Sequence, residues 1–311
     1  METLFTLFGA PVTAYGVNAA CALALTLLLS GVFAARKKAD YGSVIRLAAA
    51  AIPLCWLFSR LFYVLANCTY YLTTLSNPSL ALRFFDGGYA LSGAVAGLIL
   101  AAGLTEKWRK LPRGVLLDAV GLGMLPGIAV ERLGEAGTGM GLGRAIYTPW
   151  LAKLPFFAAT DETGEIVHAV YRYEALAAAL IFAGVMIYLI FRGKEALRGG
   201  DVLLMVLTLL GCAQVLLESL RNDGHMVVHF VRINQVLAMA LPVIALAIWS
   251  RRGKKPLVSW LVVIAAIALA TRQEFRIDSS ENLWLDYGIM ALCLALVAVT
   301  TLRRRSGRRI F

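Results

Sequence analysis

The sequence predicts an all-α protein, a polytopic bundle of transmembrane helices with loops on the outer face, and three observations predict this class. Hydrophobic residues make up 59% of the 311-residue chain, and the mean hydropathy is +0.74. Charged residues make up only 16%, whereas soluble domains carry about 25%. The apolar residues also gather in runs of about 20, the length that crosses a bilayer as a helix.

Nine such runs account for most of the chain. They cover residues 11–35, 44–66, 88–104, 115–133, 173–191, 201–219, 233–250, 257–271 and 284–302. The third and eighth runs are short for a hydrocarbon core about 30 Å thick. In the third run, Gly93 and Gly97 form a GxxxG pair, which predicts close contact with a neighbouring helix. The long segments 67–87 and 134–172 are expected on the outer face.

The basic residues predict the orientation of the chain. Of the 30 Lys and Arg residues, 20 lie in or at the edge of one alternate set of connecting segments, counting Arg46 at the start of the second run, and eight lie in the other set. Because cytoplasmic segments are enriched in Lys and Arg, we expect the N-terminus outside and the C-terminus in the cytoplasm. The net charge of +11 comes from these short clusters and not from a continuous basic stripe, so nucleic-acid binding is excluded.

Charged residues at the end of the fourth run give the clearest functional indication. Glu131 and Arg132 lie in an otherwise apolar segment, and Glu135 follows. An Arg in a membrane helix costs about 2.5–3.5 kcal/mol on insertion scales. Since positions 131 and 135 share a helix face, one interpretation is a structural ion pair that ends the helix. The other is that Arg132 binds a phosphate or a carboxylate through two hydrogen bonds.

A glycine-rich loop follows this run and adds a second candidate region. It has glycine at 134, 137, 139, 141 and 143 and ends on Arg144. It lacks the Gly-Lys-Ser/Thr ending of a phosphate-binding P-loop, but its backbone allows a ligand to approach closely. Glu218 and Arg221, near the end of the sixth run, are either a boundary ion pair or share a cavity with Arg132. Glu174 opens the fifth run, where it is either a helix cap or a functional group.

Histidine and cysteine do not predict a metal or cofactor site. The close pair His225 and His229 follows a glycine and has no third ligand at a convincing distance. The five cysteines are scattered along the chain and are interpreted as small apolar residues.

The order and spacing of these residues resemble the prolipoprotein diacylglyceryl transferase family over residues 11 to 250. The matching motifs are Tyr15-Gly16; Arg60-Leu61 with Tyr63-Val64-Leu65; Asp86-Gly87-Gly88 with Gly93; Gly127 with Arg132-Leu133-Gly134 and Gly139 through Gly143-Arg144; His168 with Tyr173-Glu174; and Glu218 with Arg221. The resemblance implies a family core at 1–250 with seven spans. Two further spans and a basic cytoplasmic tail occupy 251–311. It also implies a multi-pass protein of the bacterial plasma (inner) membrane.

The resemblance implies an activity in lipoprotein biosynthesis. A diacylglyceryl group passes from phosphatidylglycerol to the lipobox cysteine thiol of a preprolipoprotein signal peptide, a thioether forms, and glycerol 1-phosphate leaves. The thiol, with a pKa of about 8.5, needs a proton acceptor, and the phosphate needs cationic donors. Catalysis is expected of Arg132, Glu135 and Glu218. Substrate binding is expected of Arg132, Tyr15, Arg60, Gly134, Gly143, Arg144 and Arg221.

The chain departs from the family pattern in ways that leave two alternatives open. Six positions of the family pattern carry a different residue here: Ser92 replaces a histidine, Glu135 and Thr138 replace asparagines, Met140 replaces a glutamate, Gln214 replaces an arginine and Leu210 replaces a tyrosine. These changes remove a candidate base and one phosphate-binding cation, which favours a relative that binds phospholipid or lipoprotein precursor without turnover. Intramembrane charges also occur in small-solute transporters, but the two halves show no inverted repeat.

Overall fold

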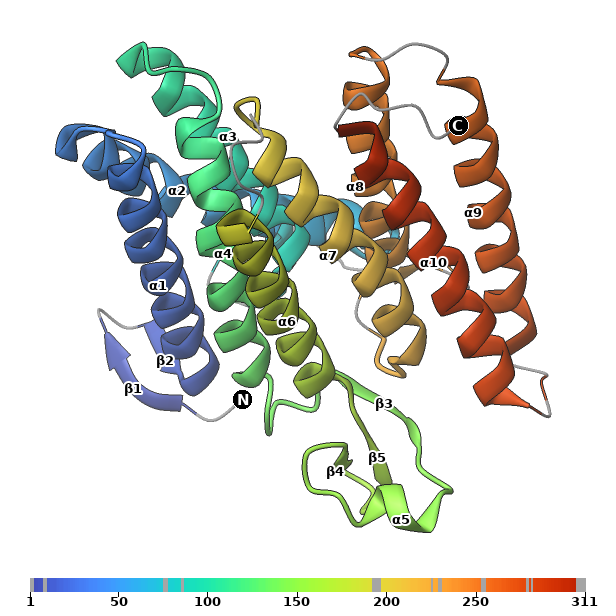
Figure 1. Ribbon diagram of the computed structural model, residues 1–311. Coiled ribbons are helices and arrows are strands. Elements are labelled where there is room, and N and C mark those ends of the chain that lie inside the picture. Colours follow the sequence, from blue (N-terminus) through green and yellow to red (C-terminus); the bar gives the residue numbers. More distant parts are fainter. Residues whose placement is uncertain are drawn as a thin grey trace. The chain divides into compact units, whose positions relative to one another are not determined.

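The computed structural model describes residues 3–7, 10–74, 78–84, 87–191, 197–224, 226–228, 231–252, 256–277, 280 and 282–305. Helices dominate the described part of the chain (Figure 1). Nine of them are long: α1 (Ala14–Arg36), α2 (Tyr41–Ala66), α3 (Leu91–Arg109), α4 (Val115–Leu133), α6 (Val170–Phe191), α7 (Asp201–Leu220), α8 (Ile233–Ser250), α9 (Leu257–Ile277) and α10 (Leu283–Arg305). Each coincides with a predicted run, and the all-α polytopic class is confirmed.

Seven of these helices are long and apolar enough to cross a membrane, counting only the described ranges. The two long helices outside this set are α3 and α4. Within 19 residues, α4 carries Asp118, Glu131 and Arg132, and charges of this kind lower the apolar character of a segment. The structure is therefore that of a multi-pass membrane protein, while nine crossings stay a prediction.

The chain divides into two compact units. The first comprises residues 1–203 and 221–233, and the second comprises residues 204–220 and 234–311. These units follow packing within the chain. The predicted division into 1–250 and 251–311 rests on the resemblance to a family and stays a prediction.

Close helix contacts hold the first unit together. α1 packs on α4, α2 on α3, and α4 on α6. A Cβ atom at Gly93 or Gly97 would overlap the carbonyls of Phe58 or Leu54 on α2, which confirms the close contact predicted from the GxxxG pair. The start of α4 is fixed by Glu106, whose carboxylate accepts hydrogen bonds from the backbone N–H groups of residues 114, 116 and 117 at 2.7–3.0 Å.

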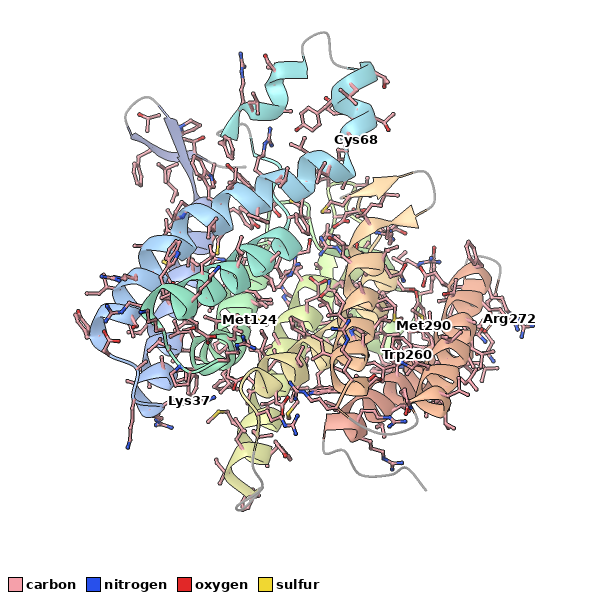
Figure 2. All side chains as sticks on the ribbon, turned by 90° about the horizontal axis from the view of Figure 1, so that it is seen from above. Lys37, Cys68, Met124, Trp260, Arg272 and Met290 are labelled. Atoms are coloured by element: carbon pink, nitrogen blue, oxygen red, sulfur yellow. The ribbon has the colours of Figure 1, made fainter. Side chains whose placement is uncertain are left out.

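Asp118 connects α4 to residues 37, 202 and 203 of the first unit at the same end of α4. It is 2% exposed and accepts hydrogen bonds from the backbone N–H groups of Val202 and Leu203 at 3.0 and 3.2 Å. It also lies 2.7 Å from the ammonium of Lys37, a residue labelled in Figure 2. α4 therefore begins in a polar junction with α1 and the start of α7, and its other end is available for the site.

Short strands occupy the segments between helices. β1 (Thr3–Leu7) and β2 (Ala10–Thr13) form a hairpin before α1, and β6 (Val227–Val228) pairs with β7 (Val231–Arg232). The segment 67–90 contains a π-helical turn (Tyr70–Thr74) and a 3-10 turn (Pro78–Leu82). A three-stranded antiparallel sheet in the order β3-β5-β4 forms from Leu142–Ala145, Ile166–Ala169 and Ala158–Thr160, with α5 (Pro149–Ala152) between β3 and β4. This sheet extends beyond the ends of α4 and α6 (Figure 1).

The second unit has an apolar core of its own. Buried residues from α7, α8, α9 and α10 belong to one cluster, including Val215, Leu246, Val263 and Met290. The Tyr287 hydroxyl donates to the backbone oxygen of Ser219 at 3.3 Å. In Figure 2, Met290 and Trp260 lie among these helices, while Arg272 points away from α9. The two C-terminal helices therefore complete the apolar core around α7 and α8 within this unit.

Candidate functional site

The site is built where α4 ends, within the first unit. The side-chain amide of Asn18 on α1 donates to the backbone oxygens of Val130 and Glu131 at 2.9 and 3.3 Å, which satisfies carbonyls of the last helical turn. A Cβ atom at Gly134 would overlap this amide. A glycine is required there because α1 and the end of α4 approach so closely.

Arg132 lies in the last turn of α4 and is 7% exposed. Its Nη1 donates to Oε1 of Glu135. Its Nε lies 3.1 Å from Oε2 of Glu174 and 3.6 Å from Oε2 of Glu131. The predicted local ion pair is therefore confirmed, but the helix end is buried and a further carboxylate from α6 contacts the same guanidinium.

Arg221 joins the same cluster from the segment that follows α7. It is 2% exposed, and its Nη1 donates to Oε2 of Glu174 at 3.2 Å. Its Nη2 donates to Asp223 at 2.7 Å and lies 3.7 Å from Oε2 of Glu135. Glu174 thus bridges Arg132 and Arg221. Arg221 and Arg132 therefore share one carboxylate, whereas a cavity common to Glu218, Arg221 and Arg132 stays a prediction.

Two further contacts connect this cluster to α1 and to the glycine-rich loop. The hydroxyl of Tyr15 donates to Oε1 of Glu131 at 2.7 Å. The carboxylate of Asp223 accepts from the backbone N–H of Gly141 at 2.8 Å, and a backbone bridge joins Gly143 to Arg221. Gly137, Gly139 and Gly141 have φ near +70°, a backbone conformation that favours glycine.

Acidic groups outnumber the guanidinium groups in this cluster. Four carboxylates, those of Glu131, Glu135, Glu174 and Asp223, contact Arg132 and Arg221. Arg232 is a third cation, and it donates to the backbone oxygens of Arg221 and Asp223 at 2.6 and 3.3 Å. Burial raises the pKa of Glu135, just beyond the end of α4, to about 7, against the lowering effect of Arg132 and Arg221.

Arg60 lies in a separate environment. It is 3% exposed and donates to the backbone oxygens of residues 80, 81, 87 and 88. Its guanidinium also lies 6.0 and 5.7 Å from the rings of Tyr63 and Tyr71. Arg60 thus joins residues 80 and 81 to residues 87 and 88.

The other predicted residues are distributed over both units. Arg144 and Gly143 lie on β3, and Gly134 supports the end of α4. Glu218 belongs to the second unit, is fully buried, and its Oε2 accepts a hydrogen bond from Gln214 at 3.4 Å. Asp86, His225 and His229 lie outside the described residues.

Sequence reasoning missed Asp223 and the link between Tyr15 and Glu131. Asp223 lies two residues after Arg221, within reach of its guanidinium, and this short spacing is the signal that could have identified it. Tyr15 and Glu131 are 116 positions apart, so no local pattern reports their contact.

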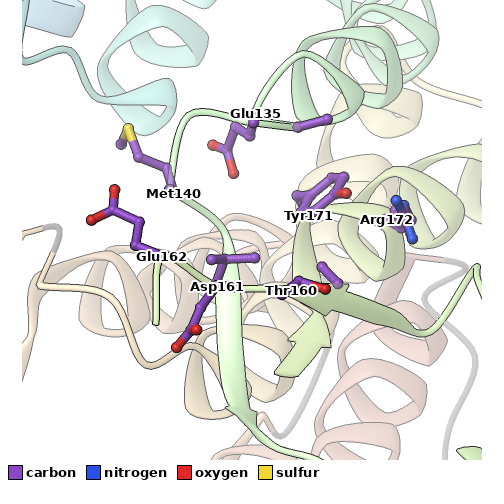
Figure 3. Close-up of a pocket in the computed structure, with 12 residues that line it drawn as sticks. Glu135, Met140, Thr160, Asp161, Glu162, Tyr171 and Arg172 are labelled. Atoms are coloured by element: carbon purple, nitrogen blue, oxygen red, sulfur yellow. The ribbon is translucent and has the colours of Figure 1, made fainter. Parts of the chain in front are cut away.

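A cavity of about 400 Å³ lies beside the cluster (Figure 3). Glu135 forms part of its wall, together with the glycine-rich loop, β4, Glu162 and Tyr171. Arg132 is not among its lining residues. A second cavity of about 280 Å³ adjoins the same loop and is lined by Asp223 and Glu165.

Comparisons with known proteins show the family of the chain. The family model described as prolipoprotein diacylglyceryl transferase matches residues 2–251. A Clostridioides difficile protein is 31% identical over 222 residues, which cover 71% of this chain and 84% of the relative. A protein of Nostoc sp. is 29% identical over 78% of this chain and 87% of the relative. A protein of Symbiobacterium thermophilum is 28% identical over 78% of this chain and 89% of the relative. All three are named phosphatidylglycerol–prolipoprotein diacylglyceryl transferase.

The matched range contains the whole described Arg132 cluster, from Tyr15 to Arg232. It ends where α8 ends, so α9 and α10 lie beyond it. Since the match spans more than half of the sequence and includes every residue of the buried cluster, this chain belongs to the prolipoprotein diacylglyceryl transferase family.

Proposed function

We propose that this chain transfers a diacylglyceryl group from phosphatidylglycerol to the lipobox cysteine of preprolipoproteins. Membership of the family and the names of the relatives support the reaction. One structural observation carries the assignment of the site. Two buried guanidinium groups, those of Arg132 and Arg221, lie 3.1 and 3.2 Å from the same carboxylate of Glu174 at the end of a helix bundle. Because carboxylates contact both guanidinium groups, these cations act on a phosphate when one of the carboxylates is displaced or protonated.

The reaction needs one nucleophile, one proton acceptor and one cation. The cysteine sulfur attacks the glyceryl carbon that bears the phosphate, and a C–S bond forms as the C–O bond breaks. Glycerol 1-phosphate leaves with the bonding electron pair, and the thiol proton passes to a carboxylate. The product is a thioether, and the phosphate carries the developing negative charge that Arg132 stabilises.

Glu135 connects the proton transfer to the phosphate. Its carboxylate contacts Arg132. A phosphate therefore binds this guanidinium by displacing the carboxylate of Glu135. With a pKa of about 7, raised by burial, Glu135 accepts a proton readily near neutral pH. Once protonated it neutralises Arg132 less, and more of the guanidinium's charge then acts on the leaving phosphate.

The remaining residues have supporting roles in this proposal. Arg221 is the second cation, and Tyr15 orients Glu131 through its hydrogen bond. Arg60, Gly134, Gly143 and Arg144 belong to the substrate-binding set, with Arg60 acting through the segment that it contacts. Glu218 is the alternative proton acceptor. The acceptor cysteine is expected at the outer membrane surface, which agrees with an N-terminus outside and a C-terminus in the cytoplasm.

A second candidate function is binding of phospholipid or lipoprotein precursor without turnover. The observation that favours it is the charge balance, because four carboxylates contact Arg132 and Arg221. The family histidine and one family arginine are also replaced, by Ser92 and Gln214.

Mass spectrometry of a lipobox peptide separates the two functions. Purified protein in phosphatidylglycerol liposomes is expected to convert the peptide to its diacylglyceryl thioether. Arg132→Ala is expected to lower the rate about 10²–10³-fold, the usual loss for one charge-stabilising donor. Because this variant leaves buried carboxylates without their cation, thermal unfolding of Arg132→Ala and Arg132→Lys is measured in parallel.

Arg109→Gln is the matched control, since Arg109 pairs with Asp40 at 2.7 Å on a partly exposed surface outside the cluster. It is expected to retain the wild-type rate. Normal lipidation by Arg132→Ala would contradict the proposed site. Binding of phosphatidylglycerol with no thioether from the wild type would favour the second function.

A further inference from the structure

The cavity beside the Arg132 cluster has no role in the transfer described above, yet one wall is a buried acid. Glu135 is 2% exposed, and its Oε2 makes no hydrogen bond within the described residues. Figure 3 shows its carboxylate pointing into the space between Met140 and Tyr171. Across this space, Glu162 on the β4–β5 turn lies close to Gly139, 3.2 Å from where a Cβ atom would stand.

The charged residues that line the cavity indicate the charge of the ligand that it binds. Its acidic and basic lining residues are Glu135, Asp161, Glu162 and Arg172. The guanidinium of Arg172 donates to the backbone oxygens of Pro155 and Ala158 and lies 5.1 Å from the Tyr171 ring. Since Glu135 is paired with Arg132 and Arg221 and Arg172 is engaged with backbone oxygens, the charge that faces the cavity comes mainly from Asp161 and Glu162. These two acids repel a lipid phosphate and attract a cation.

One of these acids, Asp161, stabilises the turn between β4 and β5. Oδ1 of Asp161 accepts hydrogen bonds from the Thr163 hydroxyl and from the backbone N–H groups of residues 163 and 165 at 2.7–2.9 Å. It thereby shapes the turn that carries Glu162. This leaves Glu162 at the exposed rim and Glu135 at the buried wall as the groups that meet a ligand.

The shape of the cavity fits a long basic side chain. Met140, Leu142, Ala159 and Tyr171 provide apolar surface, and the carboxylates stand beside it. Lysine and arginine combine an apolar stem with a charged end group and pack in this way on other proteins. A volume of about 400 Å³ is sufficient for one such side chain with part of its backbone.

The acceptor polypeptide is the substrate that can place such a side chain here. Glu135 contacts Arg132 and also lines the cavity, so a group in the cavity lies next to the proposed reaction centre. The polypeptide continues past its cysteine, whereas the lipid donor carries negative charge. Strand β4, which lines the cavity, pairs only with β5 among the described strands and leaves an edge along which an extended chain can lie.

We propose that this cavity binds a lysine or arginine side chain located a few residues after the acceptor cysteine. The site therefore determines which precursors are preferred, and the proposal rests on the transferase function above. Rim ion pairs are modest in energy, so we expect kcat/KM for a basic peptide to exceed that for a neutral peptide about two- to fivefold. The preference should decrease as salt is added.

The test compares lipobox peptides that carry Lys or Gln at one of the first positions after the cysteine, scanned in turn. In Glu162→Gln, the preference for the lysine peptide is expected to vanish while the rate with the glutamine peptide stays at the wild-type value. Glu165→Gln is the matched control, because it removes the same charge from the same turn but does not line this cavity. It is expected to keep the preference.

The outcomes separate this inference from the function on which it rests. Equal kcat/KM for both peptides at every scanned position, with normal thioether formation, overturns the inference and leaves the transferase function intact. If neither peptide is lipidated, the transferase function fails, and binding of labelled peptides to the purified protein decides the inference. Tighter binding of the lysine peptide that is lost in Glu162→Gln supports it, and equal binding overturns it.

Discussion

At the scale of single residues, the distinctive feature is a buried guanidinium contacted by acids. Arg132 lies against Glu131, Glu135 and Glu174. Burying these groups costs desolvation energy, which the network recovers only while every partner is present. By the motif resemblance, Glu135 takes the place of an asparagine, a neutral side chain. A titratable group at this position makes the net charge around Arg132 depend on pH, while the guanidinium itself stays protonated.

The first prediction concerns the pH dependence caused by Glu135. Its pKa rises from 4.5 to about 7 on burial, so the folded state holds a proton that the unfolded state releases. Its contribution to the free energy of unfolding is therefore fully present below pH 4.5 and is lost as the pH rises through 7. The transfer rate changes in the opposite direction, because a proton acceptor must be ionised.

The measurements are thermal unfolding and kcat/KM between pH 5 and 8. Glu135→Gln is expected to flatten the fall of the unfolding temperature and to remove the rise of kcat/KM near pH 7. A separate rise from the thiol, with a pKa of about 8.5, should persist. Glu162→Gln, an exposed acid of the adjacent cavity, serves as the control. A rise near pH 7 that survives in Glu135→Gln would point to another acceptor, such as Glu218.

At the scale of elements, small residues determine how closely the helices pack. Gly93 and Gly97 of α3 touch the backbone of α2, and Gly123 and Gly127 of α4 lie against Thr26 and Ser30 of α1. In lipid, where apolar side chains gain little by leaving their surroundings, such backbone contact is a main source of helix association. The position of Arg132 depends on it because α1 and α4 meet along their length.

The second prediction compares two glycines of α3. In Gly97→Ala the new methyl group would overlap the Leu54 carbonyl, so α2 and α3 must separate, at a cost of about 1–3 kcal/mol. At Gly103 a Cβ atom meets nothing within 4 Å, and alanine favours a helix over glycine. We expect a lower unfolding temperature for Gly97→Ala and an unchanged or higher one for Gly103→Ala. Equal effects would show that the contact does not matter for stability.

The third prediction concerns the C-terminal helices. Leu294 of α10 is 3% exposed and belongs to the core shared with α7 and α8, whereas Leu292 is 72% exposed. Leu294→Ala leaves a cavity and is expected to cost about 2–5 kcal/mol, with a clear fall in the unfolding temperature in detergent. Leu292→Ala should have a small effect. Comparable losses in both variants would contradict a common core.

At the scale of the whole molecule, the pattern of basic residues and the nine long helices predict a topology with nine membrane crossings. Nine crossings place the connection between α3 and α4 in the cytoplasm. If α3 and α4 did not cross, this connection would lie outside together with the β3-β5-β4 sheet. In both topologies the N-terminus lies outside and the C-terminus lies in the cytoplasm, so labelling only the termini does not distinguish them.

The fourth prediction uses single cysteines in a chain whose native cysteines are replaced by alanine. Trp108 is 62% exposed near the end of α3, and Tyr147 is 86% exposed in the segment after β3. With nine crossings, Trp108→Cys reacts with an impermeant maleimide only after the cells are permeabilised, while Tyr147→Cys reacts in intact spheroplasts. Labelling of both positions in intact spheroplasts would indicate seven crossings instead of nine.

The sequence alone determined the helices and the family. Each long helix follows from a continuous apolar run, because a backbone in lipid satisfies its hydrogen bonds locally. The family follows from motifs whose order is preserved along the chain. Tertiary packing decided which charges meet: Glu174 joins Arg132 from 42 positions away and Arg221 from 47. Packing also created the cavity between the glycine-rich loop and β4, since contacts between distant segments leave no periodic trace in a sequence.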